Sequence, residues 1–581
     1  MHFSSSLLSQ NLSENIATFL SQQSGIFIKS YGVSGLAAPS TRGTNFGHTA
    51  IIWNGFNIQS PMNGGLDLAL LPISLVDDIK MQYGGSSALF GSGSIGGTLH
   101  LDNQPKFETK LYGIVGGKIG SFNNVAQYSK IGFGTKKTAT SFNFFHSSGK
   151  NDFTYIKGNK LQSVVNSASK NWNVGFNEKI KLVNSQELSF NFWYQDSYRQ
   201  IPPSATSNNN LGLQEDKSIK TAIGWKKISK NIVWQARLGF FEENIFYKDI
   251  FIESPSKAKT FASAIEFTTS NKKLGLINFT LNQKHDIVNI PTANVDNRKQ
   301  DRLAVSLSLR KELFKKKLNF IFNVREDFID QKWLIPNTSI SISKTIKPIF
   351  LSYKASRNFR IPTFNDLYFT DAFARGNPNL IEEFGWGHEI NIKYKYQNTK
   401  FSFNNVLSIY SQNINNWIQW LNQDGVWSPE NFKRIWSRGI EYDGKFRKQF
   451  YNFNIISSIS HRIVFSTISS VKLGVSEKTI GKQLPYVPIY KGGGNIGLTY
   501  KNTSISYNHS FSNQIFTNAD NSTKIQGYQL GNIILSQNIL YKNTELKFNI
   551  SLNNIWNKNY QVVQNFFMPR RNYSLELQLI F

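Results

Sequence analysis

The end of this chain alternates strictly between apolar and polar residues. The apolar members are Tyr573, Leu575, Leu577, Leu579 and Phe581. A period of two is typical of a strand with one apolar face and one polar face. The same alternation recurs in residues 188–195, 303–310, 318–325 and 546–552. The sequence therefore predicts a protein built mainly of strands, each with one apolar face and one polar face.

The length of these segments favours a membrane barrel over a soluble β-sandwich. Each segment spans about 9 to 11 residues, which crosses a bilayer when the strand is tilted by about 45°. Residues 106–581 hold more repeated strands than one soluble core accommodates. Because lipid cannot bond to a free strand edge, spanning strands must close into a barrel. We therefore predict an all-β membrane protein, with a soluble basic β-protein as the alternative.

Composition excludes several other classes. No run of about 18 apolar residues occurs, so no membrane-spanning helix is expected. The chain has no cysteine, which rules out disulfides and thiolate metal sites. Its net charge of +28 is compatible with nucleic-acid binding, but the basic residues are scattered and Lys315–Lys317 is their longest run. We expect no nucleic-acid partner, and assign the excess to loops and a lumen that face anionic lipids or ligands.

The sequence offers little for catalysis. The eight histidines form no metal-binding pair at helical spacing, and the adjacent Asp77 and Asp78 would point to opposite faces of a strand. A Gly-x-Gly-x-x-Gly match at 91–96 runs into a strand pattern instead of the helix that a dinucleotide site requires. We expect no enzyme activity, no cofactor and no bound metal. The weak exception is calcium in an outer loop, with candidate ligands Asp366, Asp371 and Asn377.

The N-terminal region carries an ordered set of glycine-rich and apolar pieces. They are Arg42-Gly43, residues 48–55, Leu71-Pro72, the loop 84–91 and residues 95–97. In this order and spacing they resemble the plug domain of TonB-dependent outer-membrane receptors. Residues 356–380 and 553–573 are similar to the mid-barrel and C-terminal signatures of that family, so the resemblance covers nearly the whole chain.

The resemblance implies a plug domain in residues 1–105, seated in the lumen of a barrel formed by residues 106–581. Plugged outer-membrane transporters have 22 strands, and this length leaves about 22 residues for each strand with its loop. The expected location is the bacterial outer membrane. The expected partners are the periplasmic TonB complex, outer-membrane lipid and lipopolysaccharide, and a small-molecule ligand, with a surface lipoprotein as a further candidate.

The N-terminus departs from the family pattern. No TonB box is recognisable before the plug, and residues 1–10 lack the basic and apolar regions of a signal peptide. Residues 11–19 resemble the first plug helix, with Ser13 as its expected N-cap.

The resemblance also implies a function, the active uptake of a large and scarce nutrient. The plug loops 31–39 and 59–65 match outward-facing positions of the family and carry no charge. A neutral corrinoid suits such loops, so cobalamin is the expected ligand. The basic excess favours the alternative of a ferric siderophore or haem receptor, and a passive porin is the third possibility. The expected ligand contacts are Ser34, Leu36, Ser60, Met62, Asn63 and Trp427.

The tryptophans of residues 417–436 have two possible roles. Trp427, followed by Ser428 and Pro429, is predicted to lie in a loop where a ligand can reach it. Trp420 and Trp436 are expected in the aromatic belt that barrels carry at the lipid headgroups.

Two further positions are expected to hold the domains together. Arg42 matches a plug arginine that pairs with barrel glutamates in the family, whereas Lys80 and Tyr83 stand where an acidic residue and an arginine are usual. Contact between plug and barrel should therefore be weaker than usual or rebuilt with other groups. Phe581 resembles a terminal assembly signal, and the last strand should pair with the first barrel strand near residues 107–117.

Overall fold

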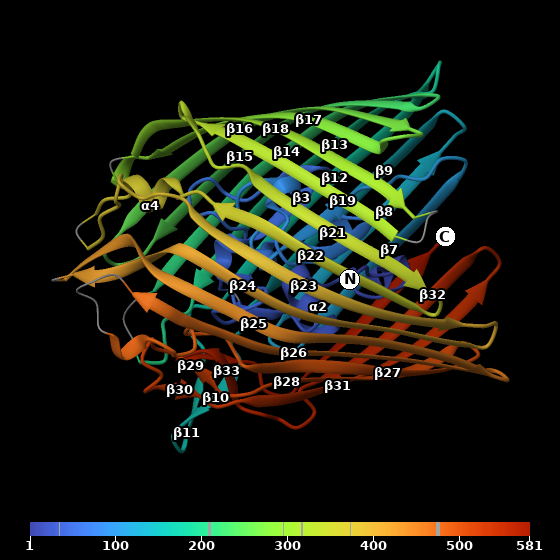
Figure 1. Cartoon of the computed structure of the whole chain (residues 1–581). Coiled ribbons are helices and arrows are strands. Elements are labelled where there is room, and N and C mark those ends of the chain that lie inside the picture. The colour runs from blue at the N-terminus through green and yellow to red at the C-terminus, as the bar shows by residue number, and fades with distance from the viewer. Residues whose placement is uncertain are drawn as a thin grey trace.

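Twenty-two long antiparallel strands close into a barrel around the N-terminal domain (Figure 1). The computed structural model describes residues 1–33, 35–206, 211–293, 295–314, 318–371, 373–423, 425–471 and 477–581. The barrel strands, with the two-residue β20 beside β19, are β7 (Leu111–Gly120), β8 (Asn124–Gly134), β9 (Thr138–Gly149), β12 (Ser169–Leu182), β13 (Gln186–Ile201), β14 (Gly212–Ser229), β15 (Ile232–Lys248), β16 (Glu253–Asn271), β17 (Gly275–Ile290), β18 (Val295–Leu313), β19 (Leu318–Ile329), β20 (Lys332–Trp333), β21 (Asn337–Ile346), β22 (Ile349–Arg360), β23 (Glu383–Gln397), β24 (Phe401–Gln423), β25 (Val426–Phe450), β26 (Phe453–Val471), β27 (Tyr490–Tyr500), β28 (Thr503–Ser512), β31 (Tyr528–Tyr541), β32 (Thr544–Asn553) and β35 (Asn572–Ile580). The predicted fold class is confirmed.

The alternation in the sequence is the alternation between lipid and lumen. On β35, the side chain of Leu575 is 51% exposed on the outer face, whereas Gln578 is 1% exposed on the inner face. Strand pleating sends successive side chains to opposite faces, so apolar residues meet lipid and polar residues meet the plug. No helix in the described part of the chain is long and apolar enough to cross a membrane.

The last strand closes the barrel against the first, as predicted. β35 pairs with β7 from Ser574 opposite Gly120 to Ile580 opposite Ile114, slightly further along β7 than expected. Beyond the strand, Phe581 and Gly113 exchange two backbone hydrogen bonds, of 2.7 and 3.0 Å. The C-terminal residue therefore belongs to the seam where the sheet closes.

Removal of Phe581 should therefore impair barrel assembly. Its aromatic ring covers Gly113, where an added Cβ would come within 2.6 Å of Cζ. Deletion removes this cover and two seam hydrogen bonds, and Phe581→Asp also places a charge on the lipid side. We expect both variants to lose the heat-modifiable band of folded barrel on gels, with Phe581→Tyr retaining it. A deletion variant that folds normally would contradict this role.

The two ends of the barrel differ. Connections at one end are two to a few residues long, while the other end carries long ones at 150–168, 361–382, 513–527 and 554–571. The connections at this other end hold the short elements β10 (Thr154–Lys157), β11 (Lys160–Ser163), η4 (Pro291–Ala293), α4 (Phe364–Tyr368), η5 (Glu477–Thr479), β29 (Ile515–Phe516), β30 (Lys524–Ile525), β33 (Tyr560–Val563) and β34 (Phe566–Met568). We call this the long-loop end.

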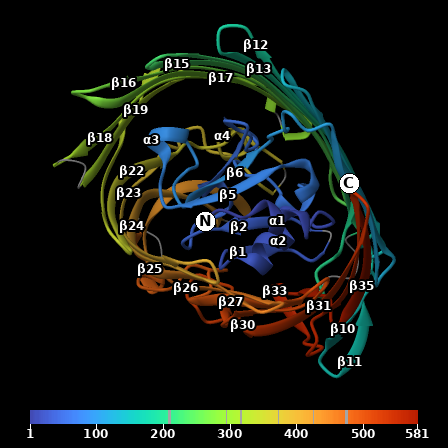
Figure 2. The same ribbon diagram turned by 90° about the vertical axis from the view of Figure 1, so that its right-hand side faces the viewer.

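The N-terminal domain fills the lumen, as the view along the barrel shows (Figure 2). Its central sheet has the order β4-β3-β6-β5, with β3 parallel to β6. Its elements are α1 (Ser5–Ser9), α2 (Ile16–Gln23), β1 (Phe27–Ser30), β2 (Ala37–Ser40), η1 (Phe46–His48), β3 (Thr49–Trp53), β4 (Phe56–Asn57), η2 (Leu68–Leu70), η3 (Ile73–Leu75), β5 (Asp78–Tyr83), α3 (Ser87–Phe90) and β6 (Gly97–Asp102). Its apolar core continues into the wall, where Trp53 meets Trp193 of β13 edge to face at 6.1 Å.

The helix predicted within residues 11–19 is α2, which starts later, at Ile16, and Ser13 is not its cap. The N-cap of α2 is Asn15, whose side chain accepts a hydrogen bond from the Thr18 backbone at 2.8 Å. Asn15 directly precedes Ile16, the first buried residue of the helix, and asparagine caps at least as well as serine.

Candidate functional site

A tight turn of the plug reaches toward the long-loop end between residues 59 and 65. The Ser60 N–H donates to the Gly65 carbonyl at 2.9 Å, and the Gly64 N–H donates to the Ser60 carbonyl at 2.9 Å. Gly64 has a φ of +76°, which a side chain would strain, and a Cβ on Gly65 would strike the ring of Phe46. The turn is therefore held in one shape by its own sequence.

A pocket of about 110 Å³, open to solvent on one side, lies between this turn and the wall formed by β13 to β17. The plug contributes Leu36, Phe46, Asn57, Ile58, Gln59, Ser60, Pro61, Asn63, Gly65, Leu66, Asp67 and Leu70. The wall contributes polar residues that include Gln195, Gln214, Ser218 and Asn244.

The charges around the pocket balance although the chain is strongly basic. Four acidic and four basic residues line it: Asp67, Asp216, Glu242, Glu243, Arg199, Lys217, Lys220 and Lys284. Arg199 joins Asp67 of the plug to Asp216 of the wall, the latter at 3.3 Å. Glu243 accepts a hydrogen bond from Ser60 and interacts with Lys220 and Lys284. The site presents paired charges and several amides, most of which already form hydrogen bonds within the protein.

The structure separates the expected ligand contacts. Leu36, Ser60 and Asn63 line the pocket, and Asn63 is exposed in it. Met62 is 2% exposed and packs away from the pocket, in an apolar cluster with Phe364 and residues of η4 and of β16 to β18. The orientation expected for Met62 is therefore wrong, because a tight turn sends neighbouring side chains to opposite sides. Ser34 lies outside the described residues.

Trp427 and Trp420 also differ from expectation. Trp427 lies on β25 instead of in a loop, and its backbone bonds to Phe373 and to Arg375, each at 2.7 Å. The Trp420 indole donates to Asp366 of α4 at 3.1 Å, so Trp420 contacts the connection 361–382 and does not lie in an aromatic belt. Trp436 does face outward, 40% exposed.

The three calcium candidates are engaged elsewhere. Asp366 caps α4 and forms an ion pair with Arg360 at 3.0 Å. Asp371 accepts hydrogen bonds from the backbone of its own turn, and the Asn377 side-chain oxygen accepts one from Asn379. No group of three metal-binding side chains was found among the described residues.

Arg42 joins the plug to two strands of the wall. Its guanidinium contacts Glu389 of β23 at 2.5 Å and Glu441 of β25 at 2.7 Å, and it lies 4.3 Å from the ring centre of Tyr410. All of these groups are largely buried. Sequence reasoning could propose Arg42 but not its partners, because a glutamate on an alternating strand carries no sign of what it faces.

In a second contact between plug and barrel, the charged residue lies on the barrel instead of on the plug. Arg462 of β26 donates to the phenol oxygen of Tyr83 at 3.0 Å and pairs with Asp443 at 2.8 Å. Burial raises the pKa of Tyr83, so its phenol stays neutral at physiological pH. A barrel arginine thus replaces the plug arginine that the sequence lacks at position 83.

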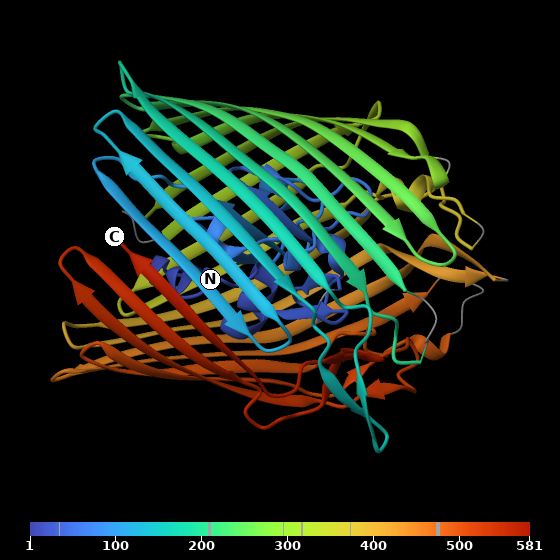
Figure 3. The same cartoon turned by 180° about the vertical axis from the view of Figure 1, so that it is seen from behind.

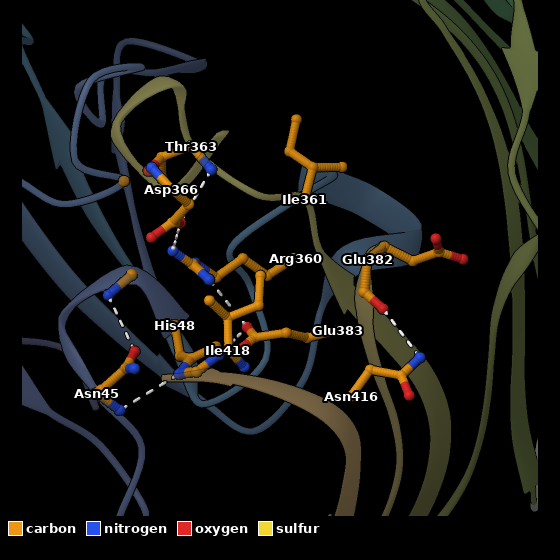
Figure 4. A network of polar contacts seen from close by, with 12 residues as sticks. Asn45, His48, Arg360, Ile361, Thr363, Asp366, Glu382, Glu383, Asn416 and Ile418 are labelled. Carbon is orange, nitrogen blue, oxygen red and sulfur yellow. Dashed lines mark hydrogen bonds and ion pairs between the residues drawn. The ribbon is translucent and has the colours of Figure 1, made fainter. Parts of the chain in front are cut away.

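A third contact between plug and barrel centres on His48, the last residue of η1 (Figure 4). His48 Nε2 lies 2.6 Å from Glu383 at the start of β23, and both side chains are fully buried. His48 Nδ1 accepts a hydrogen bond from the Asn45 backbone at 3.3 Å. The neutral Nε2–H form satisfies both contacts, since it can accept at Nδ1 and donate at Nε2.

Glu383 extends this contact to the long-loop end. It also accepts from Arg360 at 3.2 Å and from the Ile418 backbone at 2.6 Å (Figure 4). Arg360 pairs with Asp366 of α4, and the α4 backbone donates to Pro61 and Met62 of the plug turn at 3.2 and 3.0 Å. A chain of hydrogen bonds and ion pairs therefore links His48, directly before β3, to the turn that lines the pocket.

His48→Ala should loosen the plug. It removes one donor to a buried carboxylate and the side-chain contact that completes the cap of η1. We expect the free energy of plug unfolding in urea to fall by about 1–3 kcal/mol. His48→Gln keeps an amide donor and should lose less. Equal urea midpoints for His48→Ala and the parent chain would show that Arg360 and the Ile418 backbone satisfy Glu383 without His48.

Comparison with known proteins agrees with this architecture. Residues 3–98 match the family model "TonB-dependent Receptor Plug Domain", and residues 83–555 match "TonB dependent receptor-like, beta-barrel". The chain is 25% identical to the vitamin B12 transporter BtuB of Photobacterium profundum, over 96% of this chain and 89% of that protein. It is 22% identical to BtuB of Vibrio vulnificus, over 73% of this chain and 68% of that protein.

Its fold resembles solved receptors at low identity. The ferric yersiniabactin uptake receptor FyuA from Yersinia pestis superposes with a TM-score of 0.79 at 11% identity, over 100% of this chain and 97% of that one. A plug with its matching barrel, covered by both family models, places the protein in the bacterial outer membrane. The chain belongs to the TonB-dependent receptor family.

Proposed function

We propose that this receptor takes up cobalamin, which binds in the pocket above the plug turn 59–65. The observation that carries the proposal is the pocket's balance of four acidic and four basic residues in a chain of net charge +28. A neutral ligand gains nothing from a charged site and would pay to desolvate unpaired charges. Paired charges beside the exposed amide of Asn63 instead suit a ligand whose rim consists of amides.

The pocket's side chains can meet both parts of a corrinoid. Asn63 supplies an exposed amide that can both donate and accept. Asn57, Gln214 and Asn244 supply half-buried amides that already donate to neighbouring groups of the protein. Leu36, Phe46, Ile58 and Phe241 supply apolar surface for a flat macrocycle. The similarity to cobalamin transporters, though distant, supports the same ligand class.

A ferric siderophore is the second candidate. The scattered basic excess would attract an anion toward the receptor before it reaches the pocket. In either case the pocket rests directly on the plug, so bound ligand can pass only if the plug moves. TonB-dependent receptors draw on TonB in the periplasm for that movement.

Calorimetry on the intact protein in detergent, with calcium present, tests the proposal. Cyanocobalamin should bind with an affinity that changes little between low and high salt, and ferric enterobactin should not bind. Asn63→Asp keeps the side-chain oxygen that accepts a hydrogen bond from the Gly65 backbone but adds a negative charge. Because cobalamin is neutral, this charge should weaken its binding no more than Asn63→Ala does. We expect a loss of roughly 1–3 kcal/mol.

The siderophore alternative makes the opposite forecast. Asn63→Asp should then weaken ferric enterobactin binding far more than Asn63→Ala does, and salt should reduce the difference. If calorimetry detects no binding of cyanocobalamin to the intact protein under these conditions, the cobalamin proposal is wrong.

A further inference from the structure

The end of the barrel opposite the long-loop end carries a ring of lysines. Figures 1 and 3 show the short turns of this end, where the C-terminus lies. Nine of these turns lie wholly within the described residues, and each has an exposed lysine in the turn or within three residues of it. We call these lysines the basic rim: Lys136, Lys137, Lys181, Lys230, Lys272, Lys273, Lys347, Lys400, Lys448, Lys501 and Lys542.

The two ends of the barrel differ in charge. The nine turns, each taken with three residues on either side, contain 14 lysines and two acidic residues. The four long connections at the other end contain eight basic and five acidic residues. Among the described residues, the ion pairs that lysines form lie at other positions than the basic rim. Anions from outside the chain are therefore needed to neutralise the rim.

Basic residues at this end also point into the lumen, as the face of β23 shows. Glu389 on this strand contacts Arg42 of the plug, so its side chain faces inward. Lys393 and Lys395 follow it by an even number of residues and share its face, since strand side chains alternate. Both lysines are exposed. They line the mouth of the barrel beyond the plug, where lipid does not reach.

Strand β25 repeats this arrangement. Glu441 faces the plug, and Lys445 and Arg447 lie on the same face nearer the short turns, both exposed. The Lys445 ammonium donates to the backbone carbonyl of His2 at 3.4 Å, which confirms that it points inward. Asp443, the acidic residue between them, is already in an ion pair with the wall. The mouth therefore extends the positive charge of the basic rim toward the barrel axis.

The distribution of these cations defines what can bind them. The short turns of bacterial outer-membrane barrels face the periplasm. Lipid headgroups surround the barrel from outside, so they leave the inward cations of the mouth without a partner. A compact protein would contact only part of a ring whose cations recur at every described turn. The arrangement suits a flat, extended polyanion that lies across the end of the barrel.

We propose that the basic rim binds the peptidoglycan network beneath the outer membrane, through the free carboxylates of its peptide stems. A single exposed contact between lysine and carboxylate is weak because salt screens it. Many such contacts to one network act together, since each one holds the next pair of groups close. The contact fixes the receptor over the cell wall, whatever ligand the pocket holds.

Co-sedimentation with purified peptidoglycan sacculi tests this proposal. The full chain is placed in nanodiscs of phosphatidylcholine, whose lipid has no net charge, in about 0.15 M salt, where charges still interact over about 8 Å. The rim variant combines Lys136→Gln, Lys137→Gln, Lys272→Gln, Lys273→Gln, Lys501→Gln and Lys542→Gln. The matched control variant replaces six exposed lysines of the long-loop end by Gln: Lys150, Lys160, Lys478, Lys482, Lys524 and Lys558. A heat-modifiable band shows that each variant is folded.

The parent chain and the control variant should sediment with the sacculi, and the rim variant should do so about fivefold less. Salt at about 1 M should release the parent chain, and sacculi with amidated carboxylates should not bind it. No sedimentation of the parent chain, or equal sedimentation of the two variants, overturns the proposal. Binding to amidated sacculi overturns the carboxylate chemistry. If nanodiscs with phosphatidylglycerol abolish binding to sacculi, lipid headgroups neutralise the rim and the proposal is wrong.

Discussion

Removal of residues 1–101 should convert the protein into an open, largely unselective pore. The plug fills the lumen, and its apolar core continues onto wall residues such as Trp193, Ala222 and Phe145. The barrel closes through its own strands, with β35 paired to β7, so it does not need the plug for its hydrogen bonds. We therefore expect a folded barrel whose empty lumen conducts ions.

Planar bilayers measure this effect. The intact protein should show conductance near the baseline, and the deletion variant should show large steps with little preference between cations and anions of similar size. Heat-modifiability of the deletion variant is the control for folding. Equal conductance of the two forms would mean that residues 1–101 do not block the lumen.

Arg42→Ala should have the second largest effect, by unseating the plug without removing it. The change removes the buried cation that Glu389 and Glu441 share, and both carboxylates stay buried. Loss of one partner of a buried ion pair costs about 3–5 kcal/mol, because the remaining charge is not solvated. Urea titration of the plug, followed within a barrel that stays folded, should show a correspondingly lower midpoint.

Matched variants separate charge from geometry. Arg42→Lys keeps the charge but cannot contact two carboxylates with one planar group, so it should lie between the parent and Arg42→Ala. Glu441→Gln in the Arg42→Ala background should recover part of the loss, since it removes one uncompensated charge. An unchanged urea midpoint for Arg42→Ala would show that the other contacts between plug and wall, such as Tyr83–Arg462 and Asp67–Arg199, hold the plug without Arg42.

Local patterns in the sequence were sufficient for the architecture. Strand pleating is a property of consecutive residues, so the alternation near Leu575 predicted a wall between lipid and lumen without knowledge of any partner strand. The strand count came from the family resemblance, and the length of the chain agreed with it. The same resemblance identified the plug from the ordered pieces of the N-terminal region, and the role of the last strand from Phe581.

Partners across the lumen were decided by the tertiary structure alone. His48 and Glu383 are 335 residues apart, and they meet only because barrel closure and strand register bring β23 to face η1. The direction of Met62 depended on a turn whose two sides face different surroundings. The neutral pocket within a chain of charge +28 has the same origin: composition counts charges, but only the folded barrel decides which of them stand opposite one another.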